Sequence, residues 1–310
     1  MSEQLTLLQI AKHCNCVGNI NALLESNEYY KFIVNEQLVG LISAKDIPAL
    51  KLALNRHPVL VIDDTSQQVQ FHDSYNNSCS SRTAGLKDLL AFMREQKSWP
   101  SLAKWRDELY PVYGDAKEPN GISLYMERAA SYNFGIRTFG VHINGIVKND
   151  EGIRMWVAKR SINKQTYPGM LDQIAAGGIG NGIGVRASML KECDEEAGIP
   201  LEIAQQAKCA GTIQYFMQSE LGLQPETQYI YDLELPSDFV PFPKDGEVDS
   251  FSLWTIDKVV EHMKNNKFKP NCALFIIDFL IRHDFINPEN EPDFLRIMDN
   301  IHRPLPFPGA

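Results

Sequence analysis

The stretch AGGIGNGIGVRASMLKECDEEAGI (residues 176–199) constrains the fold more than any other part of the chain. A glycine-rich loop runs into a predicted helix whose last turns hold Glu192, Asp194, Glu195 and Glu196. Like charges three or four residues apart on a helix repel each other, and carboxylates near a helix C-terminus oppose the helix dipole. Because local energetics disfavour this arrangement, we expect a compensating interaction elsewhere.

Helical spacing sorts these side chains into two faces. Glu192, Glu195 and Glu196 fall on one face, whereas Asp194 points elsewhere. The other face carries an apolar ridge suited to packing on a sheet, formed by Val185, Met189, Cys193 and Ala197. Three converging carboxylates favour a hard divalent cation, which would cancel their repulsion and hold a diphosphate. The alternative interpretation is a solvated acidic face.

The same stretch resembles the Nudix box. In that pattern a Gly, five residues, a Glu and seven residues precede R-E-U-x-E-E-x-G-U, where U is a bulky apolar residue. Gly177 opens the pattern here and Gly178 continues its loop. The closing segment KECDEEAGI matches the family at Glu192, Glu195, Glu196, Gly198 and Ile199. Gly198 is also suited to end the helix, because glycine adopts the left-handed conformation readily.

Two positions depart from the family pattern. Ile183 stands where the first Glu is usual, and Lys191 stands where the Arg is usual. In the family these two residues mainly pair with each other and brace the loop against the helix, whereas the later carboxylates hold the metals. The resemblance therefore implies an intact metal-binding trio, Glu192, Glu195 and Glu196, and a box loop that is supported in a different way.

A wider resemblance covers most of the chain after residue 105. Its segments are WRDELYPVY, ERAASYNFGIRTFGVHINGIV, TYPGMLDQIAAGG, KDGEVDSF, FKPNCALFIIDFLIRH and HRPLPFP. They are similar to the branch of Nudix proteins related to thiamine pyrophosphokinase, whose members carry an extra N-terminal domain. This resemblance implies hydrolysis of thiamine diphosphate or, above all, of its oxidised oxy and oxo analogues to the monophosphates, with Mg²⁺ or Mn²⁺ as cofactor.

Hydrophobic periodicity predicts two units. Residues 1–125 alternate short helical and strand-like runs and predict a small α/β domain of unknown role. The polar segment at residues 115–123 is the candidate linker. Residues 126–310 mix strands and helices in an order that suits the Nudix α/β/α sandwich with a mixed sheet.

Outside the box, a few residues are candidates for the chemistry. Glu247, in KDGEVDSF, is the candidate second catalytic carboxylate, with Asp245 as its competitor and a solvent-facing strand residue as the alternative. Lys159 and Arg160 end a predicted strand and are candidates for contact with substrate phosphate, although a basic pair at a strand end can be purely structural. His142 lies in an apolar strand and is expected in the core.

Composition limits the partners and the compartment. Acidic residues outnumber basic ones by 39 to 30, which gives no support to binding of nucleic acid or of an anionic membrane. The six cysteines are scattered, as expected for reduced thiols. Neither a signal peptide nor an apolar run of membrane-spanning length is evident. These features predict a cytoplasmic protein and leave its oligomeric state open.

Three functions compete at this point. The first is a Mg²⁺-dependent pyrophosphatase that takes a small-molecule thiamine-type diphosphate, with Glu192 as the first choice of general base and Glu247 as the second. The second keeps the fold but acts on a nucleoside diphosphate derivative, such as a nucleotide sugar. The third, motivated by Ile183 and Lys191, is a diphosphate-binding protein without turnover.

Overall fold

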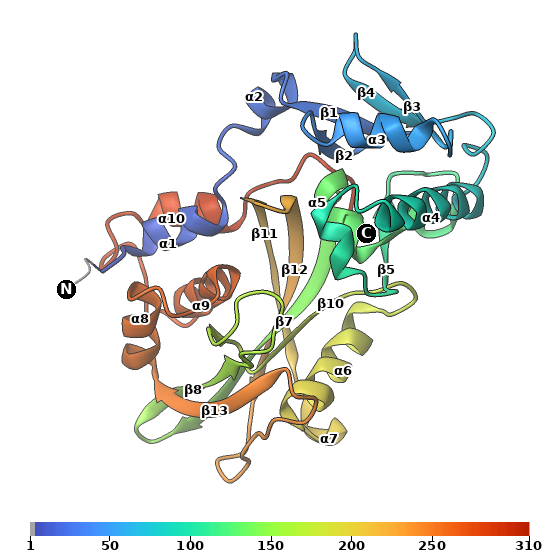
Figure 1. Ribbon diagram of the computed structural model, residues 1–310. Helices are drawn as coiled ribbons and strands as arrows, with labels where there is room; N and C mark the ends of the chain where they lie inside the picture. Colours follow the sequence, from blue (N-terminus) through green and yellow to red (C-terminus); the bar gives the residue numbers. More distant parts are fainter. Residues whose placement is uncertain (1–3, 310) are drawn as a thin grey trace.

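A computed structural model describes residues 4–309, which form three sheets surrounded by helices. Figure 1 shows a smaller sheet with its helices at one end of the molecule and a larger sheet with its helices at the other. The short ribbon of β5 (Leu109–Tyr113) and β6 (Ile122–Glu127) follows the smaller sheet in the chain.

The smaller sheet has four strands in the order β2–β1–β4–β3, and β1 pairs in parallel with β4. Its strands are β1 (Tyr29–Val34), β2 (Gln37–Ser43), β3 (Leu60–Asp63) and β4 (Gln68–Phe71). The helices of this part are α2 (Ile20–Glu25), α3 (Ile47–Leu54) and α4 (Cys79–Glu95). Buried side chains of α3 and α4 share one apolar cluster with Phe32 of β1, so this part has a core of its own.

The larger sheet follows the order β11–β12–β7–β8–β13, with β10 added on β7 and β9 on β8. Its strands are β7 (Thr138–Asn149), β8 (Gly152–Arg160), β9 (Leu171–Asp172), β10 (Ala175–Gly178), β11 (Lys208–Ser219), β12 (Gly222–Glu234) and β13 (Val248–Thr255). The β7–β12 pair is parallel, whereas the other pairs are antiparallel. The predicted mixed sheet is confirmed.

Helices cover both faces of this sheet. On one face lies α6 (Val185–Ala197), with α7 (Leu201–Ala204) directly after it. On the other face lie α8 (Ile256–Lys264), α9 (Pro270–Arg282) and α10 (Phe294–Ile301). Met189, Cys193 and Ala197 are fully buried against the sheet, as the ridge on α6 predicted. The α/β/α sandwich is thus confirmed.

The first helix of the chain, α1 (Leu7–Cys14), packs on the sandwich. Leu7, Ile10 and Cys14 belong to the apolar cluster that also contains buried residues of α9 and α10. Figure 1 shows α1 beside α9 and α10, away from the smaller sheet that contains β1. The domain boundary predicted at residue 125 stays a prediction. Helix α1 comes from the N-terminal segment, but it packs in the same helical layer of the sandwich as α9 and α10, which lie after residue 125.

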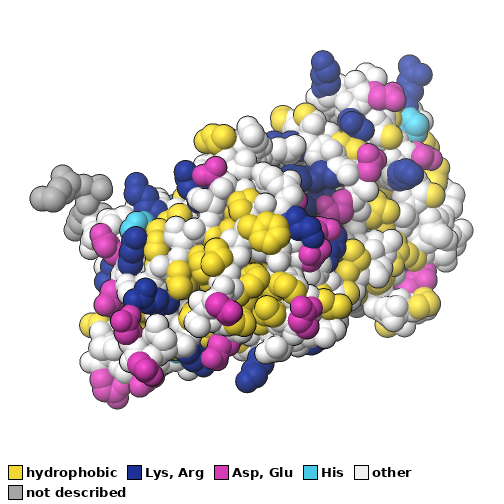
Figure 2. All heavy atoms as spheres, turned by 90° about the horizontal axis from the view of Figure 1, so that it is seen from below, with side chains coloured by type: hydrophobic (Ala, Val, Ile, Leu, Met, Phe, Trp, Pro, Cys, Tyr) yellow, Lys and Arg dark blue, Asp and Glu magenta, His cyan; other side chains and the backbone are white. Residues whose placement is uncertain are grey.

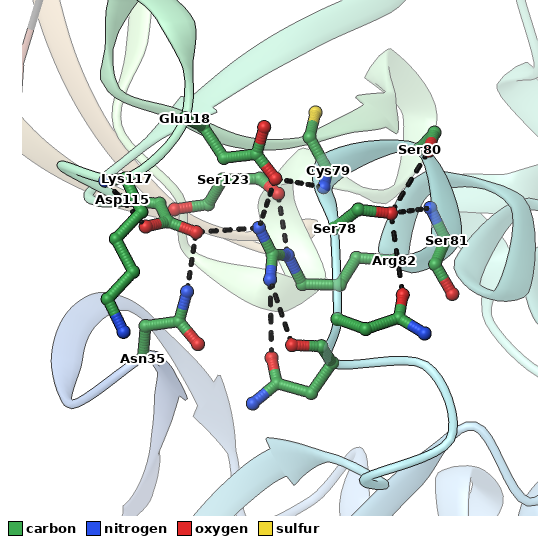
Figure 3. A network of polar contacts seen from close by, with 12 residues as sticks. Asn35, Ser78, Cys79, Ser80, Ser81, Arg82, Asp115, Lys117, Glu118 and Ser123 are labelled. Atoms are coloured by element: carbon green, nitrogen blue, oxygen red, sulfur yellow. Dashed lines mark hydrogen bonds and ion pairs between the residues drawn. The ribbon is translucent and has the colours of Figure 1, made fainter.

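A buried ion pair fixes the turn between β5 and β6 to α4 (Figure 3). Arg82 is 1% exposed, and its Nη2 lies 2.7 Å from the carboxylate of Asp115. Its Nε donates to the Ser123 carbonyl at 2.7 Å, and Glu118 accepts a further bond from the guanidinium. The segment expected to be a linker, residues 115–123, is therefore an anchored turn, because buried charges of opposite sign hold it to the helix.

We expect Arg82→Met to destabilise the protein strongly, because it leaves the Asp115 carboxylate buried without its cation. Breaking a buried pair in this way costs about 3–5 kcal/mol. Lys51→Met is the matched control: Lys51 pairs with Asp64, and both side chains are largely exposed, so its loss should cost about 0–1 kcal/mol. Urea denaturation measures both, and equal costs would contradict a structural role for the buried pair.

Candidate active site

A cleft of about 980 Å³ opens where the larger sheet, α6 and the β5–β6 ribbon meet. Glu192, Glu195 and Gly177 line it from the box. The first unit contributes Arg106 and Tyr110 to the same walls, and Arg128 lines them from just beyond that unit, which the linear sequence did not suggest. The side chains that line the cleft beside the box therefore come from both units of the chain.

The box helix begins after Gly184 and ends at Gly198, whose φ of 62° is the left-handed conformation predicted for it. Glu192 lies directly over Gly177, since a methyl group at position 177 would overlap with its carboxylate. The glycine is therefore required by close approach: it lets a carboxylate from α6 lie against the backbone of β10.

Glu196 is the most enclosed carboxylate of the trio. It is 7% exposed, and its Oε2 accepts a hydrogen bond of 2.8 Å from the Ala176 amide. Burial raises the pKa of Glu196 well above its usual range, and the nearby negative charge of Asp172 raises it further. A carboxylate in this position is stabilised in its ionised form by a cation.

Lys191 lies between the two more exposed carboxylates. Its Nζ is 2.8 Å from Glu195 and 3.7 Å from Glu192. Burial raises the pKa of Glu192, although Lys191 lowers it. Because Ile183 offers no carboxylate, the lysine at the family's Arg position pairs instead with two carboxylates of the predicted metal-binding trio. The predicted replacement of the usual brace is thus visible in the pairing of Lys191.

The first unit supplies a support for the box loop. The Asn181 amide donates to the Leu109 carbonyl of β5 at 2.9 Å. The phenol of Tyr110 lies against Gly178, where a methyl group would overlap with its oxygen. Arg128 stacks 5.4 Å from the centre of the Tyr110 ring and pairs with Glu108 at 2.7 Å. The β5 strand therefore buttresses the loop directly.

Glu247 also lines the cleft, where its carboxylate forms an ion pair with Lys164. Asp245 lines the cleft too, but its Oδ1 accepts the Glu247 amide at 2.8 Å. Burial raises the pKa of Glu247, but the hydrogen bond and charge of Lys164 outweigh it, so the net direction is downward. A carboxylate held in this way is a weak base.

The two predicted phosphate ligands are separated by the pleat of β8. Arg160 lines the cleft, but its three nitrogens donate to Asp172 at 2.7 Å and to the carbonyls of Thr166 and Tyr167 at 3.1 Å. Lys159 is not among the lining residues, and it pairs with exposed Asp249 at 3.2 Å. The phosphate role of this pair stays a prediction, and Arg160 acts in the structure as a brace for residues 161–170.

A second cluster of potential metal ligands lies beneath the cleft. Donor atoms of His142, Asp172 and Cys272 all lie within 4.8 Å of one another, and all three residues are buried. Asp172 already pairs with Arg160 and accepts the Cys272 thiol at 2.7 Å, so its charge is compensated. His142 is the core residue expected, and burial lowers its pKa to about 3. Sequence spacing gave no sign of this cluster.

Comparisons with known proteins place the chain in a family. The NUDIX domain profile matches residues 138–273, and a profile described as a domain of unknown function (DUF4743) matches residues 6–138. Nudix hydrolase 20, chloroplastic, of Arabidopsis thaliana is 38% identical over 285 residues, which are 85% of this chain and 70% of that protein. The chain therefore belongs to the Nudix hydrolase family, and the predicted hydrolase of diphosphate bonds is confirmed at that level.

Two further relatives match across both units. An uncharacterized protein of Saccharomyces cerevisiae is 36% identical, covering 80% of this chain and 74% of its own length. Nudix hydrolase 24, chloroplastic, of Arabidopsis thaliana is 35% identical, covering 95% and 77%. An N-terminal unit ahead of the Nudix domain is therefore shared with these relatives. The finer branch and the cytoplasmic location stay predictions.

The outer surface is mixed in charge. On the face shown in Figure 2, acidic and basic side chains are interspersed, and apolar side chains gather toward the middle. Within residues 4–309, no helix has the length and apolar character that crossing a membrane requires.

We expect Gly177→Ala to lower turnover of a diphosphate substrate by about 100-fold, because displacing a reacting group by about 1 Å has an effect of that size. The new methyl group would push the Glu192 carboxylate off β10. Gly184→Ala is the control, since nothing lies within 4 Å of its Cβ position and its φ of −73° suits alanine. Steady-state phosphate release compares the variants, and equal activity would contradict the close approach.

Proposed function

We propose that this protein is a Mg²⁺-dependent hydrolase of thiamine diphosphate and, above all, of its oxidised oxy and oxo analogues, which it converts to the monophosphate and phosphate. One observation carries the proposal: Glu192, Glu195 and Glu247 line the same cleft as Lys164 and several other cations. Carboxylates suit a hard metal ion, and cations suit a diphosphate. The thiamine ring rests on the resemblance of the wider segments.

The trio Glu192, Glu195 and Glu196 fits Mg²⁺. All of its donors are carboxylate oxygens, which Mg²⁺ prefers and Mn²⁺ also accepts, whereas zinc favours nitrogen and sulfur. Burial raises the pKa of Glu192 and of Glu196, so both lie where a cation is needed. When bound, such an ion neutralises phosphate oxygens and acidifies a coordinated water.

Different side chains of the cleft serve proton transfer and neutralisation of the diphosphate charge. The carboxylate of Glu192 lines the cleft, with Lys191 Nζ 3.7 Å away, and it would take the proton as water attacks phosphorus and the anhydride P–O bond breaks. Glu247 is held by Lys164 and is the second choice. Lys164 and Arg106 line the cleft and can offset the negative charge of the diphosphate.

The cleft also suits a planar organic group. Tyr110, Tyr132 and Tyr167 line it, and tyrosine rings stack on any flat ring. A nucleoside diphosphate derivative therefore remains the second candidate substrate. A binding protein without turnover is disfavoured, because repulsion among three carboxylates destabilises the helix unless a cation is bound.

The first test is phosphate release from thiamine diphosphate, its oxy analogue, ADP-ribose and a nucleotide sugar, each with Mg²⁺ and with EDTA. We expect metal-dependent release with the oxidised thiamine form preferred. Preference for ADP-ribose or the nucleotide sugar would transfer the function to the second candidate. Binding of a diphosphate without any release would indicate the third.

We expect Glu192→Gln to lower turnover by about 10²- to 10⁴-fold, the usual contribution of a general base. Glu195→Gln and Glu196→Gln should also lower it strongly, without lowering the melting temperature in EDTA, because each removes a repelling charge. Asp194→Asn is the control within the same acidic run: it points away and pairs with Lys244 at 2.6 Å. Mg²⁺ should raise the melting temperature of the control more than that of Glu196→Gln, and the reverse would contradict the metal site.

A further inference from the structure

Lys269 is a cation without a partner on the wall of the cleft. It lies directly before α9, and no acceptor from residues 4–309 is within hydrogen-bond or ion-pair distance of its Nζ. Burial lowers the pKa of Lys269, but the charge of Asp172 and other acidic groups raises it, and the net direction is upward. A charged ammonium on this wall has hydrogen bonds left to donate.

Glu226 offers the complementary group on the same wall. Its Oε2 accepts hydrogen bonds from Gln228 Nε2 at 2.7 Å and from the phenol of Tyr215. Its Oε1 accepts none from residues 4–309, and the residue lines the cleft. One oxygen therefore fixes the orientation of the carboxylate, which leaves the other available to a ligand.

A hydrogen-bond chain connects Glu226 to the helix that follows Lys269. Asn271 Nδ2 donates to the Tyr215 phenol at 3.0 Å, and that phenol donates to Glu226. Asn271 lies two residues after Lys269, in the first turn of α9. The region is on the face of the larger sheet that α9 covers, whereas the box helix α6 covers the other face. It is thus built apart from the proposed metal ligands.

Two glycines let side chains lie close to the backbone in this region. Gly140 lies under Gln228, where a methyl group would overlap with the amide oxygen. Gly178 leaves room for the Tyr110 phenol in the same way. The side chains of Gln228 and Tyr110 therefore lie directly against the backbone of the cleft floor beside Glu226.

We propose that Glu226 and Lys269 form a specificity subsite for the organic group of the substrate, which takes a nitrogen heterocycle with an N–H donor beside an acceptor atom. The donor would bind Glu226 Oε1, and the acceptor would bind Lys269 Nζ. The inference rests on the proposed function and adds the residues that recognise the ring of the substrate. Both an aminopyrimidine edge and a lactam edge have such a pair, so the two are separated by experiment.

The test uses the full-length protein and the unhydrolysed products thiamine monophosphate and its oxy analogue. Isothermal titration in EDTA should show affinity about 10- to 100-fold lower in Lys269→Met and in Glu226→Gln, the effect of losing a charged hydrogen bond. Lys269→Arg should retain part of the affinity. Lys267→Met is the control, because Lys267 is exposed and close in sequence. Of thiamine monophosphate and its oxy analogue, the ligand whose affinity falls more in Lys269→Met carries the acceptor that Lys269 binds.

A ring-free substrate separates this subsite from a phosphate site. In Lys269→Met, kcat/KM for methyl diphosphate should fall far less than kcat/KM for the thiamine-type substrates. Equal losses would overturn the inference, because Lys269 would then bind the diphosphate, and so would unchanged affinity for both monophosphates. Absence of turnover in the wild type would overturn the proposed function instead, since the titration does not depend on hydrolysis.

Discussion

The contact between Glu192 and the backbone at Gly177 is the constraint on which the site depends. It joins α6, which packs on one face of the sheet, to β10, which runs along the cleft floor. Because a side chain at position 177 would separate them, the helix and the glycine strand have to be positioned together. The apolar ridge of α6 provides that positioning, with Met189 and Cys193 fully buried beneath the charged face.

The first unit forms part of the wall of the candidate active-site cleft. Its β5 strand accepts the Asn181 amide and places Tyr110 against the box loop. In the family pattern, a Glu–Arg pair gives the loop its internal brace, and here Ile183 and Lys191 replace that pair. Support from a second unit is a physical reason why the altered box can keep its shape. The Arg82–Asp115 pair in turn fixes the turn that leads out of β5 (Figure 3).

Local patterns predicted the parts of the site that lie close together in sequence. Helical spacing placed three carboxylates on one face of α6, and Gly198 ended the helix as expected. The same reasoning did not reveal that the pleat of β8 separates Lys159, which pairs with Asp249, from Arg160, which lines the cleft. Nor did it find Lys164 as the partner of Glu247, since a loop brings together residues that are far apart in the chain.

The sequence by itself determined the family, the mixed α/β class and the acidic face of the box helix, because each follows from spacing within a few turns or strands. Only the tertiary structure decided which unit supports the box loop and which charges remain unpaired in the cleft. Lys269, Glu226 and Tyr110 belong to different elements, and their proximity depends on how α9, β12 and β5 pack around one sheet. Which side chains are buried and which charges are paired depends on that packing, so no local sequence pattern predicts it.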